Sequence, residues 1–436
     1  MKVQKFGGTS VGTPQRMKEV ARLVQKSPGN LVVLSAMSGT TNALLEIADY
    51  FAKGNRQSAS ALIGKLHSTY MAHIEQLYST LEAQEQTRTF LNNIFDRLLA
   101  YAKGDFTPQM EKEIVSYGEI MSTNMLANYF NEQGVNTVLL NALDFMRIDE
   151  DKEPDVNYLR EHITPLIEAN SQAEYFITQG FICLNHLGEI DNLQRGGSDY
   201  TASLIGAAIK ADLIEIWTDI DGMHNNDPRY VENTKPVHQL HFEEAAELAY
   251  FGAKILHPTC VLPAKAAGIP VKLLNTMQPD AEGTLINNQF QHNQIKAVAA
   301  KDNITAIKIV SSRMLLQTGF LRKVFEIFET YHTPIDMVTT SEVGISMTID
   351  CTDYLANITD DLKQYGIVEV DREMCIICVV GDLRSQNTGF ESTITNALHN
   401  IPIRMISYGG SNHNISFLIH QDDKQAALQA LSAELF

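Results

Sequence analysis

A chain of 436 residues is long enough for two or three domains, and its apolar fraction of 44% and charged fraction of 20% are those of a globular protein. The net charge of −18 argues against binding nucleic acid, which needs a basic surface. No apolar run approaches the ~20 residues of a membrane helix, and the chain begins with a strand-like stretch instead of a signal-peptide pattern. We therefore expect a cytoplasmic protein that binds neither nucleic acid nor membranes.

The first residues combine a strand, a glycine pair and the start of a helix. Residues 1–6 alternate as a short strand, Gly7-Gly8 lets the backbone turn sharply, and a helix is predicted from about Pro14 to Lys26. Such a turn aims backbone N–H groups at a phosphate, and Lys5 adds a positive charge. The motif is neither a P-loop nor G-x-G-x-x-G, and a tight turn with an incidental lysine explains these residues equally well.

Several further elements follow in chain order. Residues 30–35 form an apolar run typical of a buried strand, and a loop rich in small and hydroxyl residues follows them. The pattern is helical and polar from about Leu44 to Tyr101, and one long helix is predicted over Met110 to Asn131. Glu119 falls outside the apolar stripe of that helix, so the periodicity alone predicts a solvated glutamate.

A second stretch rich in chemistry comes after strands at residues 135–140 and 174–180. It reads Arg195-Gly-Gly-Ser-Asp199 and runs into an alanine-rich helix that ends near Ala211. Arg195 offers a planar fork for a carboxylate or phosphate, and Asp199 could orient a lysine or a metal. Helix capping alone would explain Ser198 and Asp199 but not the arginine and the glycines, so we favour a functional role.

The next segments indicate an acidic loop, a helix and a linker. A strand at residues 214–218 leads into the acidic stretch 219–229. This stretch suits the edge of a nucleotide or Mg²⁺ site, and a solvated turn explains it equally well. A helix is predicted from His241 to Gly252, with Lys254 and His257 at its exit. A last strand at residues 270–275 precedes a stretch around residues 279–294 with linker composition.

The remainder of the chain is an internal duplicate. Each copy has a strand, a Thr-Gly-Phe turn, a helix and two further strands, and the turns begin at Thr318 and Thr388. A repeat of this kind predicts two copies of one small α+β module. Cys375 and Cys378 form a C-x-x-C within a predicted strand, where positions three apart face opposite sides, so we expect core cysteines and no metal site.

Taken together, these motifs resemble the aspartokinases over essentially the whole length. The motifs that carry the resemblance are Lys5-Phe-Gly-Gly-Thr-Ser-Val11, Gly118-Glu119, Arg195-Gly-Gly-Ser-Asp-Tyr-Thr201, Trp217-Thr-Asp219 and Phe251-Gly-Ala-Lys-Ile-Leu-His-Pro258. The resemblance implies an α/β amino-acid-kinase fold, a mostly parallel sheet between helices, followed by two ferredoxin-like βαββαβ ACT modules. It places the catalytic domain at residues 1–288, a linker at 289–303 and the ACT modules at about 304–370 and 371–436.

The resemblance also implies the reaction and its catalytic residues. ATP would phosphorylate the β-carboxylate of L-aspartate, the first step toward lysine, threonine and methionine. Lys5 would lie on the transferring phosphoryl group, and Asp199 would hold Lys5 in place. The residues carried over for aspartate binding are Thr41, Glu119, Arg195 and Ser198.

The family pattern assigns a further set of residues to ATP, whose phosphates would carry Mg²⁺. The set is Lys5, Phe6, Gly7, Gly8, Thr218, Asp219, His224, Arg229 and Lys254, in which Gly7 and Gly8 would donate backbone N–H groups. His224 departs from the pattern, because related chains often have tyrosine at this position. No resident metal site is expected.

In the lysine-inhibited relatives the effector lies beside the first ACT module, and the modules of two subunits pair. Carried over, the effector site would comprise Met314, Phe320, Leu321, Ile335, Asp336, Ser341 and Glu342. We therefore expect a monofunctional, lysine-sensitive homodimer. The alternatives are a threonine-inhibited aspartokinase, a kinase for glutamate, carbamate or a nucleotide, and a non-catalytic amino-acid-binding subunit; the intact Lys5, Asp199 and Glu119 argue against the last.

Overall fold

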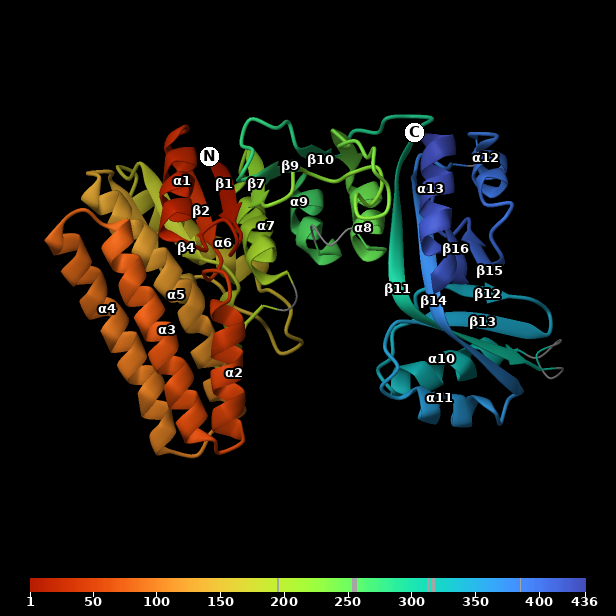
Figure 1. Ribbon diagram of the computed structural model, residues 1–436, viewed down its shortest axis with the longest axis horizontal. Coiled ribbons are helices and arrows are strands. Elements are labelled where there is room, and N and C mark those ends of the chain that lie inside the picture. Colours follow the sequence, from red (N-terminus) through yellow and green to blue (C-terminus); the bar gives the residue numbers. More distant parts are fainter. Residues whose placement is uncertain (194–195, 253–256, 312–313, 315–317, 385) are drawn as a thin grey trace. The chain divides into compact units, whose positions relative to one another are not determined.

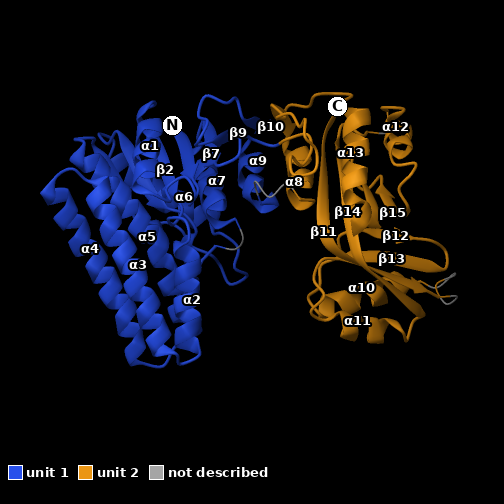
Figure 2. Ribbon diagram, in the orientation of Figure 1, with its two compact units in different colours: residues 1–223, 255–288 blue, residues 224–254, 289–436 orange. Residues whose placement is uncertain are grey.

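The computed structural model describes residues 1–193, 196–252, 257–311, 314, 318–384 and 386–436. It divides into two compact units (Figure 2). The first comprises residues 1–223 and 255–288, and the second comprises residues 224–254 and 289–436. Residues 224–254, which the sequence analysis assigns to the catalytic domain, thus make most of their contacts within the second unit.

The first unit is built on a mostly parallel sheet (Figure 1). Its strands run in the order β3-β4-β2-β1-β7-β9-β10, and all neighbours are parallel except β9 and β10. Their bounds are Lys2–Phe6 (β1), Asn30–Leu34 (β2), Thr137–Leu140 (β3), Tyr175–Gln179 (β4), Leu213–Thr218 (β7), Val271–Asn275 (β9) and Thr284–Asn287 (β10). The carboxyl ends of the parallel strands meet at one edge, where ligands of such sheets bind.

Helices surround this sheet and extend beyond it. The helices α2, α3, α4 and α5 lie side by side and carry a long apolar core (Figure 1). The helices of the first unit are Pro14–Gln25 (α1), Thr40–Ala52 (α2), Arg56–Leu77 (α3), Leu81–Ala100 (α4), Pro108–Glu132 (α5), Val156–Ala169 (α6), Gly197–Ile209 (α7) and Leu262–Ala267 (α9). The predicted helices at 14–26 and 110–131 and the helix that ends near Ala211 are thereby confirmed. The helical stretch predicted at 44–101 is present as α2, α3 and α4.

Short elements complete the first unit. A small hairpin, Ile182–Leu184 (β5) and Ile190–Asn192 (β6), follows β4, and 3₁₀ turns lie at Tyr101–Lys103, Ala142–Asp144 and Pro258–Val261. The composition of residues 279–294 predicts a linker, yet Thr284–Asn287 forms β10. It pairs antiparallel with β9 because Thr284 and Ile286 can bury their side chains there.

The second unit contains one antiparallel sheet in the order β12-β13-β11-β14-β16-β15. Its strands are Ile295–Val310 (β11), Val338–Thr340 (β12), Gly344–Ile349 (β13), Ile367–Gly381 (β14), Ile403–Tyr408 (β15) and Asn414–His420 (β16). The helices are Phe242–Tyr250 (α8, preceded by the short strand β8, Gln239–His241), Phe320–Thr330 (α10), Leu355–Leu362 (α11), Phe390–Ala397 (α12) and Lys424–Leu435 (α13), with a 3₁₀ turn at Gln421–Asp423.

The two predicted modules are present as two apolar cores along this sheet. The long strands β11 and β14 pair with each other along most of their length and serve both cores. Residues 295–303, which the sequence analysis assigns to a linker, are part of β11. Cys375 and Cys378 are buried free thiols in β14, so the prediction of core cysteines is confirmed.

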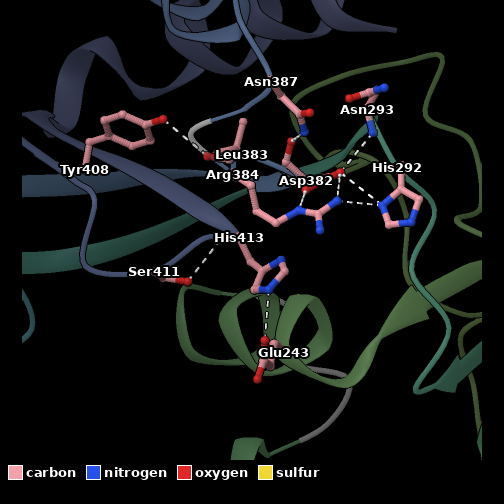
Figure 3. Close-up of polar contacts among 10 residues, drawn as sticks. All are labelled: Glu243, His292, Asn293, Asp382, Leu383, Arg384, Asn387, Tyr408, Ser411 and His413. Atoms are coloured by element: carbon pink, nitrogen blue, oxygen red, sulfur yellow. Dashed lines mark hydrogen bonds and ion pairs between the residues drawn. The ribbon is translucent and has the colours of Figure 1, made fainter.

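A buried carboxylate fastens the start of β11 to the second module (Figure 3). Asp382 accepts hydrogen bonds from the Arg384 guanidinium at 2.6 and 2.8 Å and from the backbone N–H of Asn293 at 3.0 Å. These bonds hold the pKa of Asp382 well below its usual range.

Among the described residues, no helix is long and apolar enough to cross a membrane.

Candidate active site

A cavity of 460 Å³ opens at the carboxyl edge of the parallel sheet. The loops after β1 and β2, helix α5 and the start of α7 surround it. Six predicted site residues line it, namely Lys5, Gly8, Thr41, Glu119, Ser198 and Asp199. The structure therefore brings together side chains that lie almost 200 positions apart in the sequence.

Lys5 and Asp199 form an ion pair inside this cavity. The Lys5 ammonium lies 2.6 Å from a carboxylate oxygen of Asp199, and the two side chains are only 11% and 15% exposed. Lys5 is the penultimate residue of β1, which pairs with β7, and Asp199 lies in the first turn of α7. A cation held at this depth can neutralise charge on an anionic reactant without first losing a hydration shell.

Glu119 is buried, which contradicts the solvated position that helix periodicity predicts. Only 3% of the residue is exposed, and one oxygen accepts the backbone N–H of Ala36 at 3.1 Å. The reason is Gly118, where a Cβ would lie 2.8 Å from that of Ala36, so α5 approaches the loop closely. The other oxygen has no hydrogen-bond partner among the described residues.

Burial also changes the protonation of this carboxyl group. Desolvation raises the pKa of Glu119 to about 7, although the Ala36 amide and the Lys5 charge lower it. An unpartnered oxygen that lines a cavity is suited to a ligand ammonium, which would supply both the missing hydrogen bond and a compensating charge.

The glycine pair after β1 has two different roles. The Gly7 amide donates to the Trp217 carbonyl at 3.2 Å, and its predicted contact with a phosphate stays a prediction. This bond continues the pairing of β1 with β7. Gly8 lines the cavity, and a Cβ there would lie 2.8 Å from the Ala36 carbonyl oxygen, so only glycine allows this approach.

The other predicted nucleotide residues of the first unit lie at the same sheet edge. Thr218 ends β7, and its hydroxyl donates to Asp219 at 3.1 Å. Phe6 is fully buried and stacks on Trp217 at 5.7 Å between ring centroids, so its side chain is not available to a nucleotide. The assignment of Phe6 to the nucleotide site stays a prediction, and its aromatic ring belongs to the core.

The remaining nucleotide and substrate residues fall elsewhere. His224 and Arg229 belong to the second unit, where the His224 ring contacts the Thr234 hydroxyl at 2.9 Å. Arg229 is paired with Asp227 through its Nε and Nη2 atoms. Arg195 and Lys254, predicted to bind aspartate and ATP, lie outside the described residues.

The cavity also has walls that were not predicted as site residues. They are Thr9, the loop of residues 35–39, Asn42, Phe181, Gly196 and Gly197. Residues 35–42 carry a visible signal, because a small-residue loop follows a buried strand at the edge where ligands gather. Phe181 has no such signal; it adopts a left-handed backbone conformation, and its ring packs on Gly197.

The predicted effector residues are spread over the first module. Met314, Phe320 and Ile335 belong to or pack against its apolar core, and Leu321 is exposed at the start of α10. Ser341 and Glu342 lie on the exposed turn between β12 and β13, next to the end of β11. Asp336 lies before the opposite end of β12 and is engaged with Lys301 and Tyr250.

One cluster of metal-ligand types was not predicted. His241, Glu243 and His413 offer atoms that lie within 4.8 Å of one another in the second unit. However, the His241 Nδ1 atom accepts the Glu243 backbone N–H as the cap of α8, and His413 pairs with the Glu243 carboxylate at 2.9 Å (Figure 3). Both imidazoles thus have a structural use, and we assign no metal to them.

Comparisons with known proteins agree with this architecture. Residues 1–275 match the family model described as "Amino acid kinase family", and residues 377–435 match an "ACT domain". "Lysine-sensitive aspartokinase 3" of Escherichia coli K12 is 34% identical over 100% of this chain and 99% of the relative. "Aspartokinase 1, chloroplastic" of Arabidopsis thaliana is 33% identical over 100% of this chain and 80% of the relative.

Solved structures give the same result. E. coli aspartokinase III in complex with aspartate and ADP matches with a TM-score of 0.85 at 34% identity over 100% of both chains. Aspartate kinase of Clostridium acetobutylicum matches with a TM-score of 0.87 at 25% identity, again over both full chains. The chain belongs to the amino acid kinase family, as a kinase domain joined to ACT modules. Within that family it is one of the aspartokinases, so the resemblance found in its motifs is confirmed.

Proposed function

We propose that this chain uses the cavity of 460 Å³ to transfer the terminal phosphoryl group of ATP to the β-carboxylate of L-aspartate. The observation that carries the proposal is the pairing of Lys5 with Asp199 in the same cavity as the buried Glu119. The cation suits the negative charge of the reacting groups, and the unpartnered carboxylate oxygen suits the ammonium of an amino acid that accepts the phosphoryl group. E. coli aspartokinase III, solved with aspartate and ADP, supports this assignment.

In the proposed reaction, an oxygen of the β-carboxylate attacks the terminal phosphorus and ADP leaves with the bridging oxygen. The carboxylate is ionised, so no base has to remove a proton. Glu119 binds the α-ammonium of aspartate, while Arg195, Ser198 and Thr41 hold its carboxylates. Lys5 neutralises charge on the transferring group, and Asp199 fixes the position of Lys5.

The nucleotide is assigned to Gly8, Thr218, Asp219, His224, Arg229 and Lys254. Mg²⁺ would be bound mainly by the phosphates of ATP and would neutralise their charge. Three carboxylates, Asp199, Asp219 and Glu119, lie in or beside the predicted substrate and nucleotide positions. We assign the cations Lys5, Arg195, Arg229 and Lys254 to the two anionic substrates, because a chain of net charge −18 needs local positive charge to bind them.

We further infer that the ACT modules sense L-lysine and pair in a homodimer. E. coli aspartokinase III has been solved in complex with lysine and aspartate, and it is 34% identical to this chain. The exposed Glu342 and the buried Asp336 are carboxylates suited to an ammonium-bearing effector. Threonine is the alternative effector.

The experiment that tests the reaction is the ATP- and Mg²⁺-dependent formation of aspartate β-hydroxamate, in which hydroxylamine traps the acyl phosphate. Product that depends on aspartate and falls when L-lysine is added supports both the kinase and the sensor. If the amount of product is unchanged by lysine but falls when threonine is added, threonine replaces lysine as the proposed effector. Absence of product with aspartate contradicts the proposed reaction.

Substitution of Lys5 tests the proposed role of the cation. We expect Lys5→Ala to reduce turnover at least a thousandfold and to leave aspartate binding measurable by calorimetry, because the lysine acts on the phosphoryl group. Lys2→Ala is the matched control, since Lys2 lies on the same strand but outside the cavity. Its ammonium lies 3.0 Å from a carboxylate oxygen of Glu215. Turnover of Lys5→Ala close to that of Lys2→Ala would contradict the role.

A further inference from the structure

The segment that carries two predicted nucleotide residues, His224 and Arg229, is attached to the second module. Residues 224–235, called the 224–235 loop below, belong to the second unit. Tyr230 and Val231 of this loop pack against the apolar core of the second module. The helix α13, which lies along β11 and β14 in that module, contacts the loop from about 200 positions later in the sequence (Figure 1).

Buried hydrogen bonds fix the first part of the loop. The Asn226 side chain donates to the Leu428 carbonyl of α13 at 3.0 Å, and its oxygen accepts the Asp227 N–H at 2.8 Å. The Val298 N–H of β11 donates to the Asn225 carbonyl at 2.8 Å. Asn226 is 2% exposed, so a shift of the loop at this point would leave a buried amide unsatisfied.

A buried lysine at the start of α13 holds the next part of the loop. The Lys424 ammonium lies 2.6 Å from a carboxylate oxygen of Asp302 in β11 and 4.2 Å from the centre of the Tyr230 ring. The Lys424 side chain is 7% exposed, and a desolvated cation is held strongly over an aromatic face. The Gln429 amide of α13 also donates to the Tyr230 carbonyl at 3.2 Å. Because Tyr230 directly follows Arg229, these contacts determine where the arginine backbone lies.

Close packing does not hold the loop against α13 along its whole length. A cavity of 540 Å³ is lined by residues 228–233 of the loop and by one side of α13. The position of this part of the loop therefore depends on the contacts that Lys424 and Gln429 make with Tyr230. The Arg229 guanidinium is 69% exposed and paired with Asp227 of the same loop, so it moves wherever the loop moves.

We propose that Lys424 is a positioning residue for the nucleotide: it holds Tyr230 beside Asp302 and so fixes the direction in which Arg229 meets ATP. The proposal rests on the proposed function, in which Arg229 binds ATP. Lys424 acts through Tyr230 and is not a catalytic residue. The second module thus contributes to nucleotide binding with no effector bound.

A positioning role affects one kinetic constant and not the others. Without the contact between the ammonium and the ring, the 224–235 loop samples further positions, and ATP binds only the fraction in which Arg229 is correctly placed. The aspartate residues Lys5, Glu119 and Ser198 belong to the first unit. The KM for ATP therefore rises while kcat and the KM for aspartate stay unchanged, whereas partial unfolding would lower kcat.

The test is the steady-state kinetics of Lys424→Met in the full chain. We expect the KM for ATP to rise about tenfold, with kcat and the KM for aspartate within about twofold of the wild type. Lys363→Met is the matched control, because Lys363 pairs with Asp360 at the surface of the first module and should change none of the three constants.

A double-mutant cycle tests whether Lys424 acts through Tyr230. Tyr230→Leu should also raise the KM for ATP about tenfold, and the double variant with Lys424→Met should raise it no further, because both changes remove the same contact. Effects that multiply in the double variant overturn the proposal. A KM for ATP in Lys424→Met that equals that of Lys363→Met overturns it too, as does a loss of kcat without a change in KM.

A second variant covers the case in which Lys424→Met does not fold. Asp302→Asn removes the charge that holds Lys424, and the position is 38% exposed, so water can hydrate the new amide. We expect the KM for ATP to rise at least threefold, a smaller effect because Lys424 remains. An unchanged KM in this variant overturns the proposal.

Arg229→Ala separates failure of this proposal from failure of the proposed function. If Arg229→Ala raises the KM for ATP at least tenfold while Lys424→Met does not raise it, the nucleotide assignment stands and the positioning role of Lys424 is wrong. If Arg229→Ala leaves the KM for ATP unchanged, Arg229 is removed from the nucleotide site and the proposal falls with it.

Discussion

At Glu119, the proposed recognition of the substrate is linked to the protonation of one side chain. Its carboxyl group is buried in the active-site cavity, and burial raises its pKa to about 7. Because the raised pKa belongs to the folded state, this group adds stability at low pH, and that contribution is lost as the pH rises through about 7. A bound ammonium would reverse the effect by favouring the ionised form.

This protonation gives a prediction for the pH dependence of substrate binding. In the wild type we expect the KM for aspartate to fall as the pH rises through about 7, because only ionised Glu119 pairs with the α-ammonium. Glu119→Gln should raise this KM at least tenfold and make it nearly independent of pH between roughly 6 and 8. Steady-state kinetics across this range checks it, and an unchanged pH profile in Glu119→Gln would remove Glu119 from the ammonium site.

At the scale of elements, the site depends on backbones that approach one another closely. The loop after β1 and the loop after β2 meet at Gly8 and Ala36, and α5 meets the second loop at Gly118. Each approach needs a missing Cβ, so the glycines hold the cavity walls at their spacing. The positions of Lys5 and Glu119 follow from that spacing.

The close approach of Gly8 to Ala36 predicts opposite results for substitutions at Gly8 and at Gly64. Gly8→Ala should reduce kcat/KM at least a hundredfold, because its Cβ would lie 2.8 Å from the Ala36 carbonyl oxygen and separate the loops. Gly64→Ala, inside α3 with no atom near the added Cβ, should stabilise the fold by about 0.5–1 kcal/mol without loss of activity. Activity and melting temperature of both variants are the measurements, and full activity in Gly8→Ala would contradict this account.

At the scale of the whole molecule, the second unit exposes apolar side chains that one chain does not bury. Leu321 and Phe325 on α10 and Val343 after β12 are 41%, 37% and 44% exposed, and Ile367 at the start of β14 is 70% exposed. A group of this kind around one module favours association with another protein surface. The proposed homodimer through the ACT modules offers that surface.

The proposed dimer has a measurable mass. Light scattering after size-exclusion chromatography should give twice the chain mass of 48.6 kDa. Phe325→Glu should shift the protein toward a single chain, since a carboxylate in an apolar interface would lose its hydration. A wild-type mass of one chain, or a dimer unaffected by Phe325→Glu, would contradict the proposed interface.

The sequence by itself determined the elements whose signal is local. Helix α5, the strands around the glycine turn, the two repeated modules and the core cysteines of β14 were all predicted, because hydrophobic periodicity, glycine turns and caps are read over a few neighbouring residues. The motif set also identified the family and named Lys5, Glu119 and Asp199. Thr284–Asn287 was missed because a short strand next to turn residues has little periodicity.

Only the tertiary structure decided what each of these residues contacts. Burial of Glu119 depends on Ala36, the Gly7 amide is taken by Trp217, and Phe6 belongs to the core through the same tryptophan. Asp336, a candidate for an effector, is already paired with Lys301. In each case the partner is remote in sequence, and desolvation and hydrogen bonding are set by which segments the fold brings together, so local pattern carries no trace of them.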